Sequence, residues 1–142
     1  MLKGEYRILP DCDNHITHWV CQGLHEDEDW LGAHLTFGFA LGGEMIGGLI
    51  FHQYQPHHSL WWTVYSTDKR WCNRRMLKAM FGLAFKVLDC RRINLLVSAS
   101  NAASLNFVHK LGFQTEGLLR RFRDNGEDCY ILGMLKSECK WL

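Results

Sequence analysis

The chain has 142 residues, of which 47% are hydrophobic and 13% aromatic, and sixteen basic residues nearly balance fifteen acidic ones to leave a net charge of +1. This length and composition suit one packed domain over residues 1–142 and exclude wholesale disorder. The near-neutral charge gives no general reason to expect nucleic acid or a membrane surface as a partner, so an anion site would require local clustering of basic residues.

Targeting signals and cysteine motifs are missing from the sequence. It has no apolar run long enough to span a membrane, and residues 1–13 lack the apolar core of a signal peptide, so we expect a cytoplasmic protein without membrane contact. Without a C-x-x-C pair or zinc-ligand spacing, the cysteines are expected to be reduced thiols, and no metal site is predicted. The six cysteines are Cys12, Cys21, Cys72, Cys90, Cys129 and Cys139.

The first half of the chain reads as strands around one helix. The helix has Asp11 or Asp13 as its N-cap and ends at Gly23, and the Gly42-Gly43 pair predicts a hairpin turn. Residues 25–29 are expected to form a solvated acidic loop. In chain order, the predicted elements are a strand at 6–9, a helix at 11–23, and strands at 34–41, 45–54 and 60–65.

The second half alternates helices and strands. From Asn73 the apolar residues recur at spacings of one and three, which predicts an amphipathic helix. A second helix has Asn101 as its N-cap and Gly112 as its C-terminal stop. The apolar face of the first helix is Met76, Leu77, Met80, Phe81, Ala84, Phe85 and Leu88. The other predicted elements are strands at 93–99, 113–122 and 129–135 and the helix at 102–111.

This order of elements predicts an α/β fold (α+β by some schemes). We expect a mixed, strongly twisted sheet of six to seven strands flanked by helices. The strand–helix–strand unit from Leu60 to Ala99 would be a right-handed parallel crossover, and the carboxyl ends of its strands are a natural ligand site.

Basic residues gather where the first amphipathic helix begins, and no acidic residue occurs between Asp68 and Asp89. A helix N-terminus carries about half a positive charge, so cations there are unfavourable unless an anion binds. Backbone N–H groups and arginine forks together form a phosphate site, although a solvated basic face would show the same pattern. The basic residues are Lys69, Arg70, Arg74, Arg75 and Lys78.

Short motifs between residues 70 and 138 stand in a characteristic order. They are Arg92-Ile93-Asn94-Leu95-Leu96-Val97, Asn101 to Ser104, Lys110-Leu111-Gly112-Phe113, Glu116-Gly117, Leu118-Leu119-Arg120 and Gly133-Met134-Leu135. In this order and spacing, the segment resembles the C-terminal half of GNAT-superfamily N-acyltransferases. The hairpin with Ile46-Gly47-Gly48 is similar to the family's early hairpin, and Arg70-Trp71 is similar to short members encoded by tailed bacteriophages.

The resemblance implies acetyl-CoA as the co-substrate, bound where two central parallel strands splay apart. It implies that pantetheine pairs with the backbone of the fourth strand and that the pyrophosphate binds the loop before the helix. The cofactor-binding residues implied in this way are Val64, Tyr65, Ser66, Arg70, Trp71, Cys72, Asn73, Arg74, Arg75, Asn101, Ser104 and Phe107.

The loop before the helix and residue 108 depart from the family pattern. Trp71 and the Cys72-Asn73 pair stand where the family has small residues, so the nearby arginines are expected to contribute side-chain contacts, with Arg74 or Arg75 reaching the 3′-phosphate. Val108 replaces the tyrosine that many members use as general acid, a step that a thiol with a pKa of about 8.5 does not strictly need.

Catalysis requires a neutral amine, and a lysine amine with a pKa of about 10.4 is almost entirely protonated at pH 7. A general base or a desolvating pocket is therefore expected, and a backbone N–H on the fourth strand would hold the oxyanion. The predicted catalytic residues are His52, Glu44 and Ser104, with His57, His58 and Asp68 as further base candidates. Trp61 and Trp62 point to opposite faces of the same strand; core packing of both is favoured, and an acceptor pocket formed by one of them is the alternative.

Three functions remain open from the sequence. The favoured one is N-acetyltransfer from acetyl-CoA to an amine, which would be a protein N-terminus, a lysine, a small amine or a modified base. The second is a non-catalytic module that binds acyl-CoA or serves as an interaction or phage component. The third is a nucleic-acid modifier whose Arg120, Arg121 and Arg123 contact phosphates. A homodimer is left open.

Overall fold

The computed structural model describes residues 6–9, 13–29 and 31–142. Its seven strands form a mixed sheet, and three α-helices accompany them, which confirms the predicted fold class. The chain divides into two compact units, residues 1–54 with 61–80 and residues 55–60 with 81–142. Within the described residues, no helix combines the length and apolar character needed to span a membrane.

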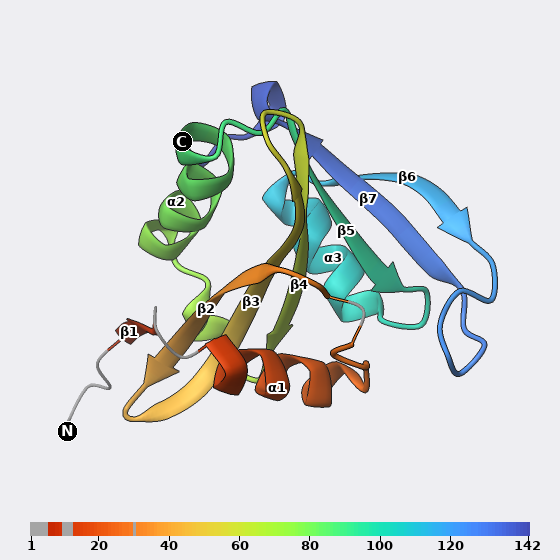
Figure 1. Cartoon of the computed structure of the whole chain (residues 1–142), viewed down its shortest axis with the longest axis horizontal. Helices are drawn as coiled ribbons and strands as arrows, with labels where there is room; N and C mark the ends of the chain where they lie inside the picture. Colours follow the sequence, from red (N-terminus) through yellow and green to blue (C-terminus); the bar gives the residue numbers. More distant parts are fainter. Residues whose placement is uncertain (1–5, 10–12, 30) are drawn as a thin grey trace. The chain divides into compact units, whose positions relative to one another are not determined.

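The first unit contains strands β1 (Tyr6–Leu9), β2 (His34–Leu41), β3 (Glu44–Gln55) and most of β4 (Ser59–Ser66), arranged in that order (Figure 1). The pairs β1–β2 and β2–β3 are antiparallel. Leu41 pairs with Glu44 across the predicted turn, where both glycines have positive φ. Helix α1 (Asp13–Leu24) also matches its prediction, while Asp11 and Cys12 lie outside the described residues.

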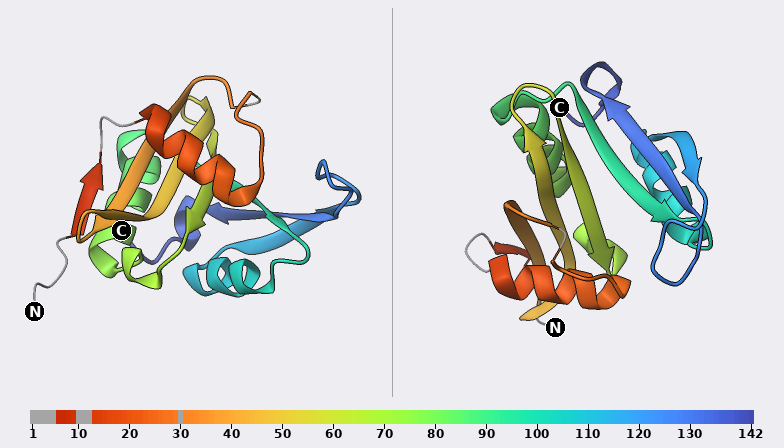
Figure 2. Two further views of the ribbon diagram at one scale, coloured as in Figure 1. Left: turned by 90° about the horizontal axis from the view of Figure 1, so that it is seen from below. Right: turned by 45° about the vertical axis from the view of Figure 1, so that its right-hand side comes forward.

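Two adjacent glycines let the sheet of the first unit pack closely on both faces. A Cβ on Gly47 would lie 2.9 Å from the ring of Trp71, and a Cβ on Gly48 would lie 2.4 Å from Cγ2 of Val20 in α1. Because successive residues of a strand point to opposite faces, α1 and Trp71 lie on opposite sides of β3. Figure 2 shows α1 along one face of these strands. On the side of the sheet that α1 covers, the buried apolar cluster consists of Ile16, Val20, Cys21, Leu31 and Ile50.

The predicted amphipathic helix forms with one local difference. Helix α2 (Arg74–Gly82) continues as a π-helical turn η2 (Leu83–Val87), closed by a bond from Leu88 N to Leu83 O. The buried residues of the π-helical turn, Ala84 and Phe85, continue the apolar spacing of one and three. The sequence pattern therefore could not distinguish this turn from α-helix. The predicted face is buried except for the half-buried Leu88 at its end.

The second unit contains strands β5 (Arg92–Ser98), β7 (Cys129–Leu135) and β6 (Gln114–Leu119) in that order, all antiparallel, and helix α3 (Ala102–Leu111). An ion pair joins Arg92 on β5 to Glu116 on β6, and Arg92 Nε also donates to Asn94 Oδ1 at 2.6 Å. A Cβ on Gly133 of β7 would collide with both charged groups, so this glycine makes room for the pair.

Strand β6 is shorter than the predicted run of residues 113–122. Phe113 is buried and donates its N–H to Val108 O, so it belongs to the end of α3. Beyond Leu119 the chain turns, because Arg121 has φ of 53° and its N–H is held by Asp128 Oδ1 at 2.8 Å. Residues 120–128 therefore form a loop rather than a strand.

Candidate functional site

The loop between β4 and α2 is fixed to the first unit at both ends. Thr67 N–H donates to Ile46 O of β3 at 2.9 Å, and the short 3-10 helix η1 (Lys69–Trp71) follows. The carboxylate of Asp68 caps this turn by accepting from Arg70 N at 2.9 Å. Cys72 N–H donates to Lys69 O at 3.0 Å, so several backbone donors of the loop are already used within it.

Trp71 points into the core of the first unit. It is 2% exposed, and its ring lies 5.2 Å from the ring of Phe39 on β2 and against Gly47 on β3. Its side chain therefore does not cover the outer surface of the loop. The large residue at this predicted binding position serves as a core anchor, and any ligand contact of Trp71 must involve its backbone.

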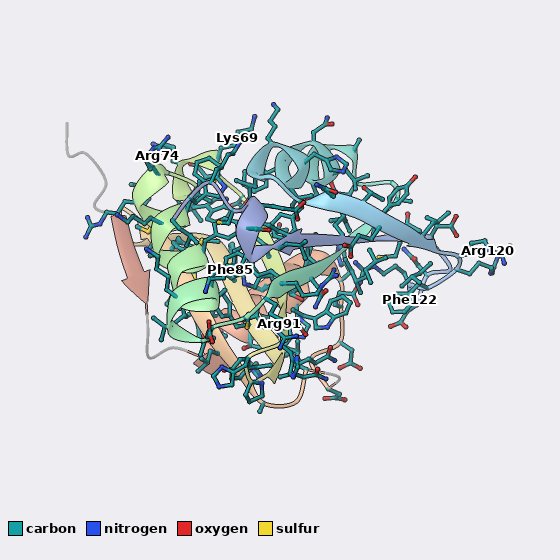
Figure 3. The ribbon with its side chains drawn as sticks, turned by 90° about the horizontal axis from the view of Figure 1, so that it is seen from above. Lys69, Arg74, Phe85, Arg91, Arg120 and Phe122 are labelled. Carbon is teal, nitrogen blue, oxygen red and sulfur yellow. The ribbon has the colours of Figure 1, made fainter. Side chains whose placement is uncertain are left out.

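The start of α2 combines a side-chain cap with positive charge. Asn73 Oδ1 accepts from Met76 N at 3.0 Å. The first turn contains no acidic residue, and Arg74, Arg75 and Lys78 are all exposed. Figure 3 shows Lys69 and Arg74 at this end of the helix. We call Lys69, Arg70, Arg74, Arg75 and Lys78 the basic segment.

Arg70 of the basic segment forms an ion pair with Asp68. Arg70 Nε lies 3.1 Å from both oxygens of Asp68, and Arg70 Nη2 lies 2.6 Å from Oδ2. These bonds lower the pKa of the Asp68 carboxyl from 3.8 to about 2, so the ion pair persists across the physiological pH range. Asp68 therefore stays ionised beside the loop.

The end of β4, predicted to bind pantetheine, has a graded exposure. Val64 and Tyr65 are half-buried and Ser66 is exposed. The Tyr65 ring packs edge-on against Trp19 of α1, 5.1 Å between centroids, and occupies the space that a side chain at Gly23 would need. The Tyr65 side chain therefore packs against α1.

The predicted catalytic residues of β3 lie at opposite ends of that strand. Glu44 pairs with Leu41 beside the hairpin turn, whereas His52 pairs with His34. Eight residues separate them, which corresponds to about 26 Å along a strand. They therefore cannot act on the same proton, and the structure does not bring them together.

His52 is a buried neutral group. It is 2% exposed, and its Nε2 lies 2.8 Å from Thr63 Oγ1 on β4. Burial, with a smaller effect from His34, lowers the pKa of His52 from 6.5 to about 4. An imidazole with this pKa is a weak base toward an ammonium group, so its catalytic role stays a prediction that its environment does not favour. Of the other base candidates, His57 pairs with Asp89, 3.2 Å from Nδ1 to Oδ2, and His58 is exposed.

In the second unit, the predicted cap of α3 is confirmed. Asn101 Oδ1 accepts from Ser104 N at 3.1 Å, and Gly112 has φ of 117° at the C-terminal end. The side chains of Ser104 and Phe107 are half-buried, and Val108 is buried. The bond to Ser104 shows that Asn101 has a structural function, and the ligand contacts of Asn101, Ser104 and Phe107 stay predictions.

The loop of residues 120–128, which follows β6 and contains three arginines, is bonded to the second unit through one of them. Arg123 Nε donates to Ser98 Oγ at 3.1 Å, while Arg120 and Phe122 are exposed at the tip of the loop (Figure 3). Asp124, Glu127 and Asp128 of the same loop equal its three arginines in number.

Sequence reasoning missed two pairings at these positions, His52 with Thr63 and Asp68 with Arg70. The first requires knowledge of how β3 and β4 align. The Asp-x-Arg spacing was a signal for the second, since a capping carboxylate commonly accepts the N–H two residues later. Among the described residues, no group of three or more His, Cys, Asp or Glu side chains is placed to hold a metal.

Comparisons with known proteins gave one family match and solved structures of similar fold. Residues 24–130 match the family model described as "Acetyltransferase (GNAT) domain". The structure is similar to spermidine N-acetyltransferase from Vibrio cholerae in complex with CoA and spermine, with a TM-score of 0.70, 16% identity, and coverage of 95% of this chain and 96% of the other. It is also similar to a chimera of the Vibrio cholerae enzyme SpeG with hSSAT, with a TM-score of 0.68, 18% identity, and coverage of 94% and 96%. No curated protein sequence gave a significant match.

Proposed function

Because the chain belongs to the GNAT acetyltransferase family, we propose that it transfers an acetyl group from acetyl-CoA to an amine. Acetyl-CoA supplies an activated thioester, and the neutral amine attacks its carbonyl carbon. The C–S bond then breaks, CoA leaves as a thiolate, and the amine loses a proton.

The observation that carries the proposal is the basic segment at the start of α2. CoA has a diphosphate and a 3′-phosphate, and this segment presents exposed cations beside a helix N-terminus. Arg74 and Arg75 lie in the first turn, where the helix dipole opposes positive charge. A bound phosphate would reverse this unfavourable arrangement, and the inward-facing Trp71 side chain would not obstruct it.

The other roles follow the family pattern. Backbone groups of Val64, Tyr65 and Ser66 would pair with pantetheine, and a backbone N–H of β4 would stabilise the oxyanion. A thiol with a pKa of about 8.5 leaves without a general acid, which accommodates Val108. The proton acceptor is proposed to be solvent-connected rather than His52, because an imidazole with a pKa of about 4 would lose the competition for the proton by about six orders of magnitude against a lysine-like amine.

The acceptor is proposed to be an amine whose class must be found by assay. The similar structures include enzymes described as acting on spermidine, and at 16–18% identity they share the fold with this chain. A suitable panel contains a polyamine, free lysine, a peptide with a free N-terminus and an amino-modified nucleobase. Turnover is followed by the release of the CoA thiol.

Titration calorimetry with CoA and acetyl-CoA tests the cofactor site. We expect Arg74→Ala to weaken binding at least about fivefold, the typical value of a charge-assisted phosphate contact at an exposed site. Lys86→Ala is the matched control, because Lys86 is an exposed cation near the other end of the same helical segment. Equal CoA affinity in wild type, Arg74→Ala and Lys86→Ala would contradict the proposed role of the basic segment in phosphate binding. Tight CoA binding without turnover of any amine would favour a binding module over an enzyme.

A further inference from the structure

Asp68 and Arg70 form a complete anion contact within the loop itself. The Asp68 carboxylate receives the Arg70 backbone N–H at 2.9 Å, Nε at 3.1 Å and Nη2 at 2.6 Å. A backbone N–H together with a two-pronged guanidinium is also the donor set that recognises a phosphate group. The protein's own carboxylate therefore occupies the donors that a phosphate would use.

The pair is held in place by the loop around it. Thr67 N–H is bonded to Ile46 O of β3, and Trp71 is buried against Phe39, so the residues on both sides of the pair are fixed to the first unit. Arg70 remains 65% exposed and Asp68 27% exposed, so the pair lies at the surface and can be reached by a solute. A competing phosphate would have to separate a preformed contact.

From this geometry we propose that Asp68 is a built-in competitor that lowers the affinity of the basic segment for the phosphates of CoA. The carboxylate occupies Nε and Nη2 of the Arg70 guanidinium, so a phosphate can use these donors only when this contact opens. This inference rests on the proposed function. The functional consequence is faster release of the CoA product, and product release limits the rate of many enzymes.

The Asp68→Asn variant tests this proposal, because the asparagine Oδ1 can still accept the Arg70 N–H while the charge is removed. We expect the variant to bind CoA about three to five times more tightly than wild type, the value of a surface ion pair. Binding of pantetheine, which carries no phosphate, should not change, and a purely structural effect would alter both ligands. Asp89→Asn is the matched control, since Asp89 is also an exposed carboxylate in an ion pair, with Lys136. We expect it to leave CoA affinity unchanged.

A double-mutant cycle separates release of Arg70 from a general charge effect. If Asp68 acts by occupying Arg70, the gain from Asp68→Asn becomes smaller in the Arg70→Ala background. An equal or larger gain in that background would overturn the proposal. Unchanged or weaker CoA binding by Asp68→Asn, with wild type binding normally, would also overturn it while leaving the proposed function intact. Absence of CoA binding by wild type would instead refute the proposed function, and this inference with it.

Discussion

Replacing Trp71 by glycine would introduce a small residue at the loop position where the family resemblance predicts one, and its outcome distinguishes two explanations of the tryptophan. If Trp71 obstructs the phosphate site, the glycine variant should bind CoA better. The structure predicts the opposite. Trp71 is 2% exposed and fills the space between Phe39 and Gly47, so its removal should leave a cavity in the first unit.

The size of the effect follows from this burial. Truncating a buried tryptophan costs about 3–5 kcal/mol, because both the transfer free energy and the contacts around the cavity are lost. An added glycine costs up to about 1 kcal/mol more through backbone entropy. For a chain of this length, the sum corresponds to a decrease in Tm of roughly 10 °C or more. Since domains are stable by about 5–15 kcal/mol, the glycine variant is expected to be marginally folded.

Urea unfolding followed by circular dichroism measures this change without relying on the fluorescence of the deleted residue. Trp71→Leu is a second variant that should remain folded, with a smaller loss of stability. Lys69→Gly is the matched control, because it adds a glycine to the same 3-10 turn at an exposed position and should cost no more than about 1 kcal/mol. The reasoning is refuted if Trp71→Gly is as stable as Lys69→Gly and binds CoA more tightly than wild type.

Three further changes test the packing, the capping and the buried histidine. Gly48→Ala should cost about 1–3 kcal/mol by urea unfolding, because its Cβ would lie 2.4 Å from Val20 Cγ2, and the additional change Val20→Ala should recover much of the loss. Asn101→Ala should cost about 1 kcal/mol through loss of the α3 cap, whereas Asn101→Asp should stay close to wild type in the same assay. Folding lowers the pKa of His52 from 6.5 to about 4. As the pH falls from 6.5 to 4, the unfolded chain therefore takes up a proton at this histidine before the folded chain does, and the free energy of unfolding should decrease by up to about 3 kcal/mol. His52→Gln should flatten this dependence, and an unchanged pH profile in that variant would contradict the assignment.

The fold was predictable where local chemistry and periodicity agree. Alternation and the Gly42-Gly43 turn located the β2–β3 hairpin, and Asn101 and Gly112 marked the two ends of α3. The end of β6 was not predictable, because the apolar run continues to Phe122. The backbone turns earlier, where Arg121 adopts a positive φ and is held by a carboxylate seven residues away.

The candidate site was predictable in composition and less so in geometry. The basic segment is visible in the sequence because an amphipathic pattern shows where the helix begins. The direction of Trp71 was not visible, since a loop residue has no periodicity that assigns it to a face. Glu44 and His52 were both reasonable bases by side-chain chemistry, and only the register of β3 places them at opposite ends of one strand.

Helices α2 and α3 have their basic residues at opposite ends, and this difference is a physical argument for a ligand at the start of α2. Helix α3 has His109 and Lys110 in its last turn, where cations favour the dipole. Helix α2 has Arg74 and Arg75 in its first turn, where each cation opposes the dipole by about 0.3–1 kcal/mol. Asn73 already caps that turn through its side chain. An anion bound at this turn would interact favourably with both the dipole and the arginines, so a helix N-terminus with this charge pattern is expected to bind one.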